Sequence, residues 1–148
     1  MLVDTSVLAR ILQPHHPSFA VTEHALDRLL RQKRQLHVVP QNLIELWVVA
    51  TQPAAQNGLG MTPTSASVEL TKLKRMFVLL ADTHDIYAVW ESLVIQYEVS
   101  GKPAHDAKLV AAMKVHRLDS ILTFDTGGFR RYPGIDVIHP ADVAATRL

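Results

Sequence analysis

The chain of 148 residues contains no cysteine. This absence excludes disulfide scaffolds, thiolate zinc sites, iron–sulfur clusters and cysteine nucleophiles, and it fits a reducing compartment. Long hydrophobic runs are lacking too. The longest spans residues 76–81, far short of the ~20 apolar residues that a membrane-spanning helix needs.

A secretion signal and a dominant charge are also missing. Residues 1–4 show neither a basic leader nor the apolar core of a signal peptide, so we expect a cytoplasmic protein without membrane association. Fifteen Lys and Arg oppose fourteen Asp and Glu. This total indicates neither a nucleic-acid binder nor an acidic protein, so the positions of the charges matter more than their sum.

The composition is that of a globular protein. Hydrophobic residues make up 48% of the chain and charged residues 20%. The length suits one domain, and neither a repeat nor a low-complexity linker interrupts it. We therefore predict a single domain over residues 1–148.

Short apolar segments alternate with amphipathic ones along the whole chain. The apolar segments predict buried strands at residues 1–3, 36–39, 77–80, 121–124 and 137–138. Helices are predicted between them over residues 5–12, from residue 18, and over 40–50, 64–76, 85–99, 104–116 and 140–145, with a loop at 52–63. Trp47 and Trp90 lie on apolar helix faces and are expected in the core. The pattern predicts an α/β fold, a three-layer α/β/α domain with a four- or five-stranded parallel sheet.

Four acidic residues fall at one edge of this predicted sheet. Asp4 follows the first strand and Asp125 follows the fourth. Glu45 lies early in the helix after the second strand, and Asp106 lies in the first turn of the helix that leads into the fourth. Taken alone, Asp4 fits a helix cap, Asp106 a first-turn acid and Asp125 a turn. Glu45 lies on a largely apolar helix, where unpaired acids are rare. Independent capping gives no reason for all four to share the edge where such sheets bind ligands.

Carboxylates gathered in this way repel one another and need a cation. Oxygen ligands from Asp and Glu suit hard ions such as Mg²⁺ or Mn²⁺. Such an ion can polarise a phosphoryl oxygen and activate a water for attack on a phosphodiester. The sequence therefore predicts a Mg²⁺ or Mn²⁺ site with hydrolytic chemistry.

Taken in order, four segments resemble the PIN-domain family, in particular its VapC-like members, the toxin halves of toxin–antitoxin pairs. They are Asp4-Thr5-Ser6, Asn42–Glu45, His105–Ala107, and Leu122–Asp125 followed by Phe129. The resemblance implies a metal-dependent ribonuclease with Asp4, Glu45, Asp106 and Asp125 as catalytic, metal-binding acids. It also implies hydroxyls near the metal at Ser6 and Thr123, a cognate antitoxin and a homodimer.

One position departs from the family pattern. Relatives often carry a further acid just before the phenylalanine, where this chain has Gly128 before Phe129. Asp125 is then the only fourth carboxylate, which bears on whether one or two ions bind.

Three further residues are candidates for supporting roles. The histidines are scattered without the spacing of a helical zinc site, and only His105 abuts a predicted ligand, where it can support Asp106. Arg130 and Arg131 follow Asp125 closely and are candidates for RNA phosphate contacts.

The leading hypothesis is a Mg²⁺- or Mn²⁺-dependent endoribonuclease that acts as the toxin of a toxin–antitoxin pair. One alternative is a PIN-type nuclease acting on DNA or flap structures. Another is a non-catalytic RNA-binding or interaction module. A phosphoacceptor signalling domain is disfavoured, because Asp4 stands alone and no lysine follows the last strand.

Overall fold

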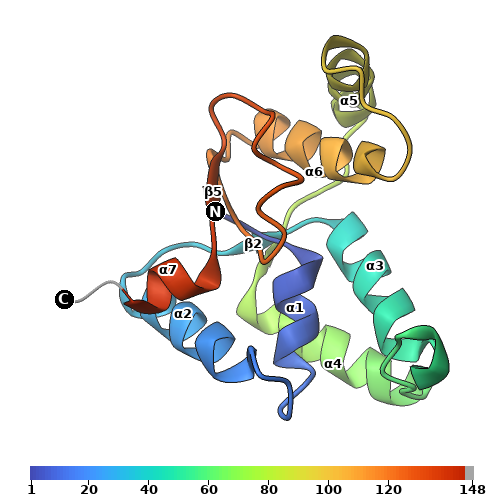
Figure 1. Cartoon of the computed structure of the whole chain (residues 1–148), viewed down its shortest axis with the longest axis vertical. Coiled ribbons are helices and arrows are strands. Elements are labelled where there is room, and N and C mark those ends of the chain that lie inside the picture. The colour runs from blue at the N-terminus through green and yellow to red at the C-terminus, as the bar shows by residue number, and fades with distance from the viewer. Residues whose placement is uncertain (146–148) are drawn as a thin grey trace.

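A computed structural model of the chain describes residues 1–145; the last three residues of the predicted domain 1–148 lie outside the described residues. Its five strands are all parallel and lie in the order β3-β2-β1-β4-β5 (Figure 1). The strands are β1 (Leu2–Val3), β2 (His37–Val38), β3 (Val78–Leu79), β4 (Ser120–Leu122) and β5 (Asp136–Ile138). The predicted parallel sheet is confirmed, with five strands.

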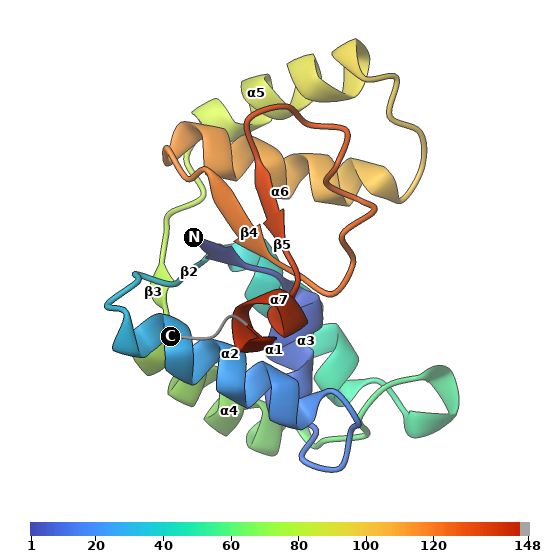
Figure 2. The same cartoon turned by 60° about the vertical axis from the view of Figure 1, so that its left-hand side comes forward.

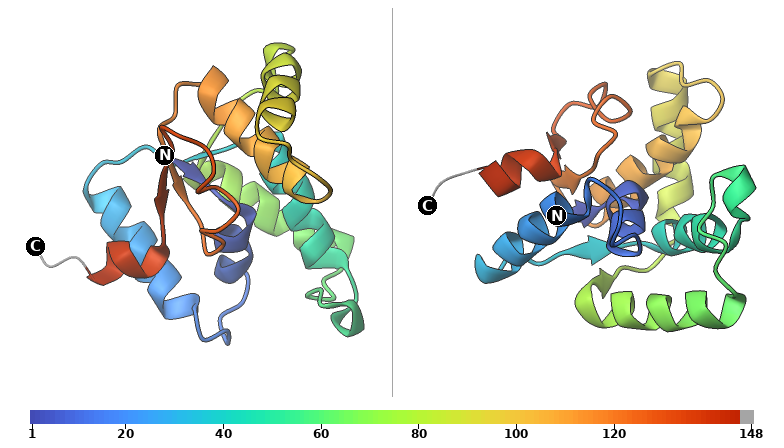
Figure 3. Two further views of the ribbon diagram at one scale, coloured as in Figure 1. Left: turned by 45° about the horizontal axis from the view of Figure 1, so that its top comes forward. Right: turned by 60° about the horizontal axis from the view of Figure 1, so that its bottom comes forward.

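Seven α-helices in the described part of the chain connect and cover the strands. They are α1 (Thr5–Ile11), α2 (Phe19–Arg31), α3 (Pro40–Thr51), α4 (Pro63–Met76), α5 (Asp85–Gln96), α6 (Pro103–Val115) and α7 (Pro140–Ala145). The last helix, α7, packs along α2 (Figure 3).

The three layers follow from the alternation of side chains along each strand. Leu2 and Ile121 point to one face, where they pack with α5 and α6. Their neighbours Val3 and Leu122 point to the other face, into a cluster with α1, α2, α3 and α4. Figure 2 shows α5 and α6 on one side of the sheet and the other helices opposite. The predicted α/β/α architecture is therefore confirmed.

The outer strand β3 differs from the prediction of a buried strand. Val78 and Leu79 are 48% and 45% exposed, because β3 is the edge of the sheet and has a partner on one side only. The predicted helix 85–99 ends at Gln96, and Glu98 adopts a left-handed conformation (φ 49°) that turns the chain away. A short 3-10 turn at Ala54–Gln56 lies inside the predicted loop 52–63.

The two tryptophans also differ from the prediction. Trp47 and Trp90 are only half-buried and not in the core. The largest fully buried side chains are instead aliphatic, together with Phe129 and Met113. Each tryptophan lines a surface hollow.

No helix within residues 1–145 is both long enough and apolar enough to cross a membrane.

The central strands set the stability of the fold. Ile121 is fully buried, and Ile121→Ala should lower the free energy of unfolding by about 2–5 kcal/mol, because it removes buried methylene groups and leaves a cavity. Ile95→Ala is the control, since Ile95 is 72% exposed, and its effect should stay within about 0.5 kcal/mol. Urea denaturation measures both values. Equal losses in the two variants would contradict the layer assignment.

Candidate active site

Asp4 lies at the junction of β1 and α1. Its backbone is extended (φ −73°, ψ 154°), and it is the N-cap of α1. Its Oδ2 accepts hydrogen bonds from the Ser6 hydroxyl at 2.6 Å, the Thr123 hydroxyl at 2.8 Å and the Ser6 backbone N–H at 3.4 Å. All the hydrogen bonds to this carboxylate within residues 1–145 end on Oδ2, which leaves Oδ1 for a cation. Capping and a place in the acidic cluster are therefore compatible for Asp4.

The same two hydroxyls fix the chain after β4. Ser6 Oγ accepts from the backbone N–H of Phe124 at 3.1 Å. Thr123 Oγ1 accepts from the backbone N–H of Asp125 at 3.0 Å, and the two hydroxyl oxygens are 3.3 Å apart. Asp125 is thereby held beside Asp4, although β4 ends three residues earlier. Both predicted hydroxyl residues lie at the site.

Glu45 is anchored by two donors that the sequence pattern did not single out. Thr5 Oγ1 donates to Oε2 at 2.9 Å, and Gln41 Nε2 donates to Oε1 at 2.8 Å. Gln41 also donates to the backbone carbonyl of His105 at 2.9 Å. This side chain therefore ties α3 to the first turn of α6, next to Asp106. The i, i+4 spacing of Gln41 and Glu45 on a helix is the signal that could have found it.

Asn42 is a third residue to which the sequence pattern gave no role of its own. It is fully buried. Its Oδ1 accepts from the backbone N–H of Val39 at 2.9 Å, which caps the start of α3. Its Nδ2 donates to Thr5 Oγ1 at 3.4 Å. Asn42 therefore orients the threonine that in turn holds Glu45.

Asp106 and Asp125 converge on Gly128. A Cβ at position 128 would lie 2.7 Å from Asp106 Oδ2 and 3.7 Å from Asp125 Oδ2. At the first distance the carboxylate of Asp106 would have to shift from where it lies. The absence of a side chain at position 128 is thus what allows the carboxylate of Asp106 to sit against the loop.

The pKa of Asp106 shows that the four acids affect one another. Burial and, after it, the charges of Asp4, Asp125 and Glu45 together raise it to about 6, while His105 opposes them. Three negatively charged neighbours and one weakly positive neighbour therefore act on Asp106. The structure therefore brings all four predicted acids to one edge of the sheet.

The four carboxylates do not yet form a closed ligand shell. Among the described residues, no three Asp, Glu or His side chains gather tightly enough to hold one ion. The like charges of the four carboxylates repel one another. Hydrogen-bond donors of their own hold Asp4 and Glu45 in place. The donor set still fits a hard divalent cation, because it offers only carboxylate oxygens, including the free Oδ1 of Asp4.

The remaining predicted residues lie around this cluster. His105 is exposed, and its contact with the site runs through its backbone carbonyl and its effect on Asp106, with no hydrogen bond from the imidazole to any of the four acids within residues 1–145. Arg130 and Arg131 are exposed on the loop after Asp125. Their side chains lie outside the acidic cluster and face the solvent.

Asp106 should destabilise the metal-free protein at neutral pH. A carboxyl whose folded pKa is raised stabilises the fold below its unfolded value, and that stability is lost as the pH rises through about 6. Asp106→Asn should therefore raise the free energy of unfolding by an order of 1 kcal/mol at about pH 8, after allowance for solvent screening, and by less at about pH 4. Denaturation in chelator, with the exposed Asp136→Asn as control, measures this difference. A stabilisation that is absent at both pH values would contradict it.

Among the solved structures that share this fold are those of FitAcB, VapBC2 and VapC20. FitAcB from Neisseria gonorrhoeae is 20% identical, with 94% of this chain and 96% of that chain covered and a TM-score of 0.67. VapBC2 from Rickettsia felis, solved on a DNA fragment from its promoter, is 11% identical, with 93% and 96% covered and a TM-score of 0.67. VapC20 from Mycobacterium tuberculosis, described as a Sarcin-Ricin loop cleaving toxin, is 20% identical, with 88% and 93% covered and a TM-score of 0.64.

The family profile described as "PIN domain" matches residues 1–135. No curated protein sequence matches the chain. The profile match covers all four acids, both hydroxyl residues, His105 and the two arginines. On this match, and with the parallel sheet described above, the chain belongs to the PIN-domain family.

Proposed function

We propose that this protein is a Mg²⁺- or Mn²⁺-dependent endoribonuclease and the toxin of a toxin–antitoxin pair. The observation that carries the proposal is the convergence of Asp4, Glu45, Asp106 and Asp125, from four separate segments, on one edge of a PIN-domain sheet. These four side chains would hold the ion and serve as the catalytic acids. When bound, a divalent cation supplies the positive charge that polarises a phosphate and lowers the pKa of a water.

The chain's own residues prepare this site for a cation. Ser6 and Thr123 occupy Asp4 Oδ2, so the carboxylate is held in one orientation and offers Oδ1. Thr5 and Gln41 do the same for Glu45. Residues that hydrogen-bond to metal-binding side chains in this way orient those side chains and tune the affinity for the ion. Asp106 has no hydrogen-bond donor of its own within the described residues and is free to turn toward an ion.

Substrate binding needs positive charge around the acids, since a polyanion is repelled by an acidic pocket. We assign this role to Arg130 and Arg131, which are exposed on the loop that also carries Asp125. Guanidinium groups contact phosphate oxygens and position a nucleic acid without reading its sequence.

A protein partner is supported by an apolar surface on α3. Ile44 and Val48 are 65% and 53% exposed, and with Trp47 and Leu70 they line a hollow of about 310 Å³. Exposed apolar patches rimmed by polar residues mark protein interfaces. The Klebsiella pneumoniae structure that shares this fold is a toxin–antitoxin complex. We propose that an antitoxin and a second copy of the chain use such surfaces here.

The nuclease proposal is tested by cleavage of RNA with and without Mg²⁺ or Mn²⁺. Cleavage should vanish in chelator, and Asp4→Asn or Asp106→Asn should each lower it by more than about 100-fold. Removing a metal-binding carboxylate should cost more activity than removing a residue that only hydrogen-bonds to such a carboxylate, which costs about 10- to 100-fold. Circular dichroism confirms that each variant is folded. Undiminished cleavage in either folded variant would overturn the assignment.

The alternatives are separated by the same assay. Cleavage of a DNA or flap substrate is compared with cleavage of RNA at one salt concentration, because binding to phosphates depends on salt. Preferred cleavage of DNA or of the flap identifies a DNA nuclease. A metal titration followed by calorimetry distinguishes a non-catalytic RNA-binding module, which would bind RNA without needing the ion.

Gly128 provides a test that leaves every proposed ligand in place. Gly128→Ala puts a Cβ against Asp106 Oδ2 and should weaken Mg²⁺ or Mn²⁺ binding and cleavage together, by about 10- to 100-fold. Gly127→Ala is the matched control, because a Cβ there lies 3.7 Å from Asp125 Oδ1, an ordinary contact. Calorimetry and the cleavage assay measure the pair. If both variants behave like the parent chain, Asp106 does not depend on this space.

A further inference from the structure

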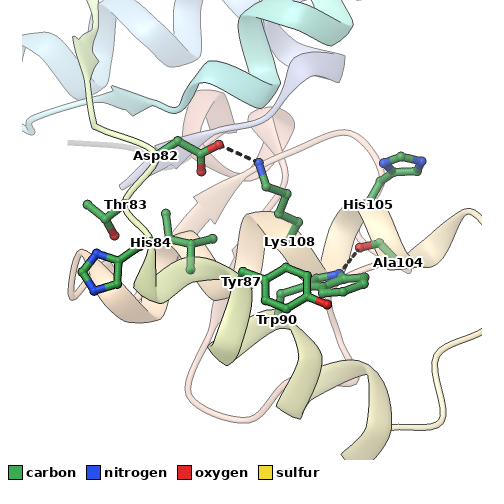
Figure 4. A pocket seen from close by; sticks show the side chains of 9 residues that line it. Asp82, Thr83, His84, Tyr87, Trp90, Ala104, His105 and Lys108 are labelled. Carbon is green, nitrogen blue, oxygen red and sulfur yellow. Dashed lines mark hydrogen bonds and ion pairs between the residues drawn. The ribbon is translucent and has the colours of Figure 1, made fainter.

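A second feature lies at the same edge of the sheet as the carboxylates. It is a hollow of about 610 Å³ between the first halves of α5 and α6, beyond the carboxyl end of β3 (Figure 4). Its volume is within the range of sites that enclose a small organic group, roughly 300–1,000 Å³. The proposed catalytic residues leave this hollow unexplained.

One wall of the hollow is a fixed aromatic surface. Trp90 Nε1 donates to the backbone carbonyl of Ala104 at 2.8 Å, which pins the indole of α5 against α6 (Figure 4). The ring of Tyr87 lies one turn earlier, with its centroid 5.5 Å from that of Trp90, and the side chain is 63% exposed. An exposed aromatic ring backed by a second, hydrogen-bonded ring is a rigid platform for stacking.

The other walls are polar. Thr83 lines the hollow, although its Oγ1 has almost no accessible surface and no hydrogen-bond partner within the described residues. Lys108 Nζ lies 2.9 Å from Asp82 Oδ2, and both side chains are more than a third exposed. An ion pair so exposed is weak, so a phosphate can compete for the ammonium.

The hollow continues toward the acids. A neighbouring hollow of about 560 Å³ shares His105 and Lys108 with the first and is lined further along by Lys102, Gln41 and Glu45. One path therefore runs from the aromatic platform, past two lysines, to a carboxylate of the candidate active site. Proteins that bind single-stranded nucleic acids have the same arrangement, in which bases stack on aromatic rings and phosphates lie against cations.

We propose that the hollow binds one base of a single-stranded RNA next to the bond that is cut. Tyr87 stacks on the base, and Lys108 and Lys102 contact the phosphates that lead to Glu45. Only an unpaired base can enter, because a base in a duplex is already stacked on both faces. This inference rests on the proposed function and adds to it the place where one base of the substrate binds.

Binding is measured by fluorescence anisotropy with a short, labelled, single-stranded RNA of mixed sequence, in chelator so that no cleavage occurs. Tyr87→Ala should bind about tenfold more weakly, because it removes the stacking surface, while Tyr87→Phe should bind like the parent chain. Ile95→Ala is the control on the same helix, since Ile95 is 72% exposed and outside the hollow.

The outcomes separate this inference from the nuclease proposal. Tyr87-dependent binding without any cleavage in Mg²⁺ or Mn²⁺ supports the base site and overturns the nuclease. Cleavage with unchanged binding by Tyr87→Ala overturns the base site alone. Light scattering completes the test: a parent dimer that Tyr87→Ala dissociates means that a second copy covers the ring, which also overturns the base site.

Discussion

The mutual repulsion of four carboxylates at one sheet edge is the constraint on which the site depends. It shows most directly at Asp106, whose pKa is raised to about 6 by burial and by its three acidic neighbours. A fold tolerates such a cluster only if other interactions hold it together, because unpaired buried charge is costly. The buried strands β1 and β4, paired side by side, provide that support and bring Asp4 and Asp125 to one place.

The four acids are held unequally. Asp4 and Glu45 each receive hydrogen bonds from two neighbouring side chains, so their orientations are set by the protein. Asp106 and Asp125 lie instead against a glycine loop that has room for them and no side chain to orient them. One half of the site is thus pre-organised, and the other half can adjust. This division suits the binding of a cation that neutralises the cluster when it arrives.

The layer formed by α5 and α6 connects the four acids to the aromatic hollow. Gln41 joins α3 to the first turn of α6, and Trp90 joins α5 to the same turn. A single turn of α6 therefore carries Asp106 toward the acids and presents His105 and Lys108 toward the aromatic hollow. A change in the packing of α6 would affect both places together, so the geometry couples the hollow to the acids.

The sequence alone determined the alternation of strands and helices, the parallel sheet and the four acids, because the side-chain periods and the chain order require no contact to be known. It also placed Ser6 and Thr123, through the family resemblance. It did not determine the partners of Glu45, the space at Gly128 or the exposure of Trp90. Thr5 and Glu45 are 40 positions apart, and Trp90 meets Ala104 across two helices. Only tertiary packing decides such contacts, because side chains that are distant in sequence meet only where helices cross and strands pair.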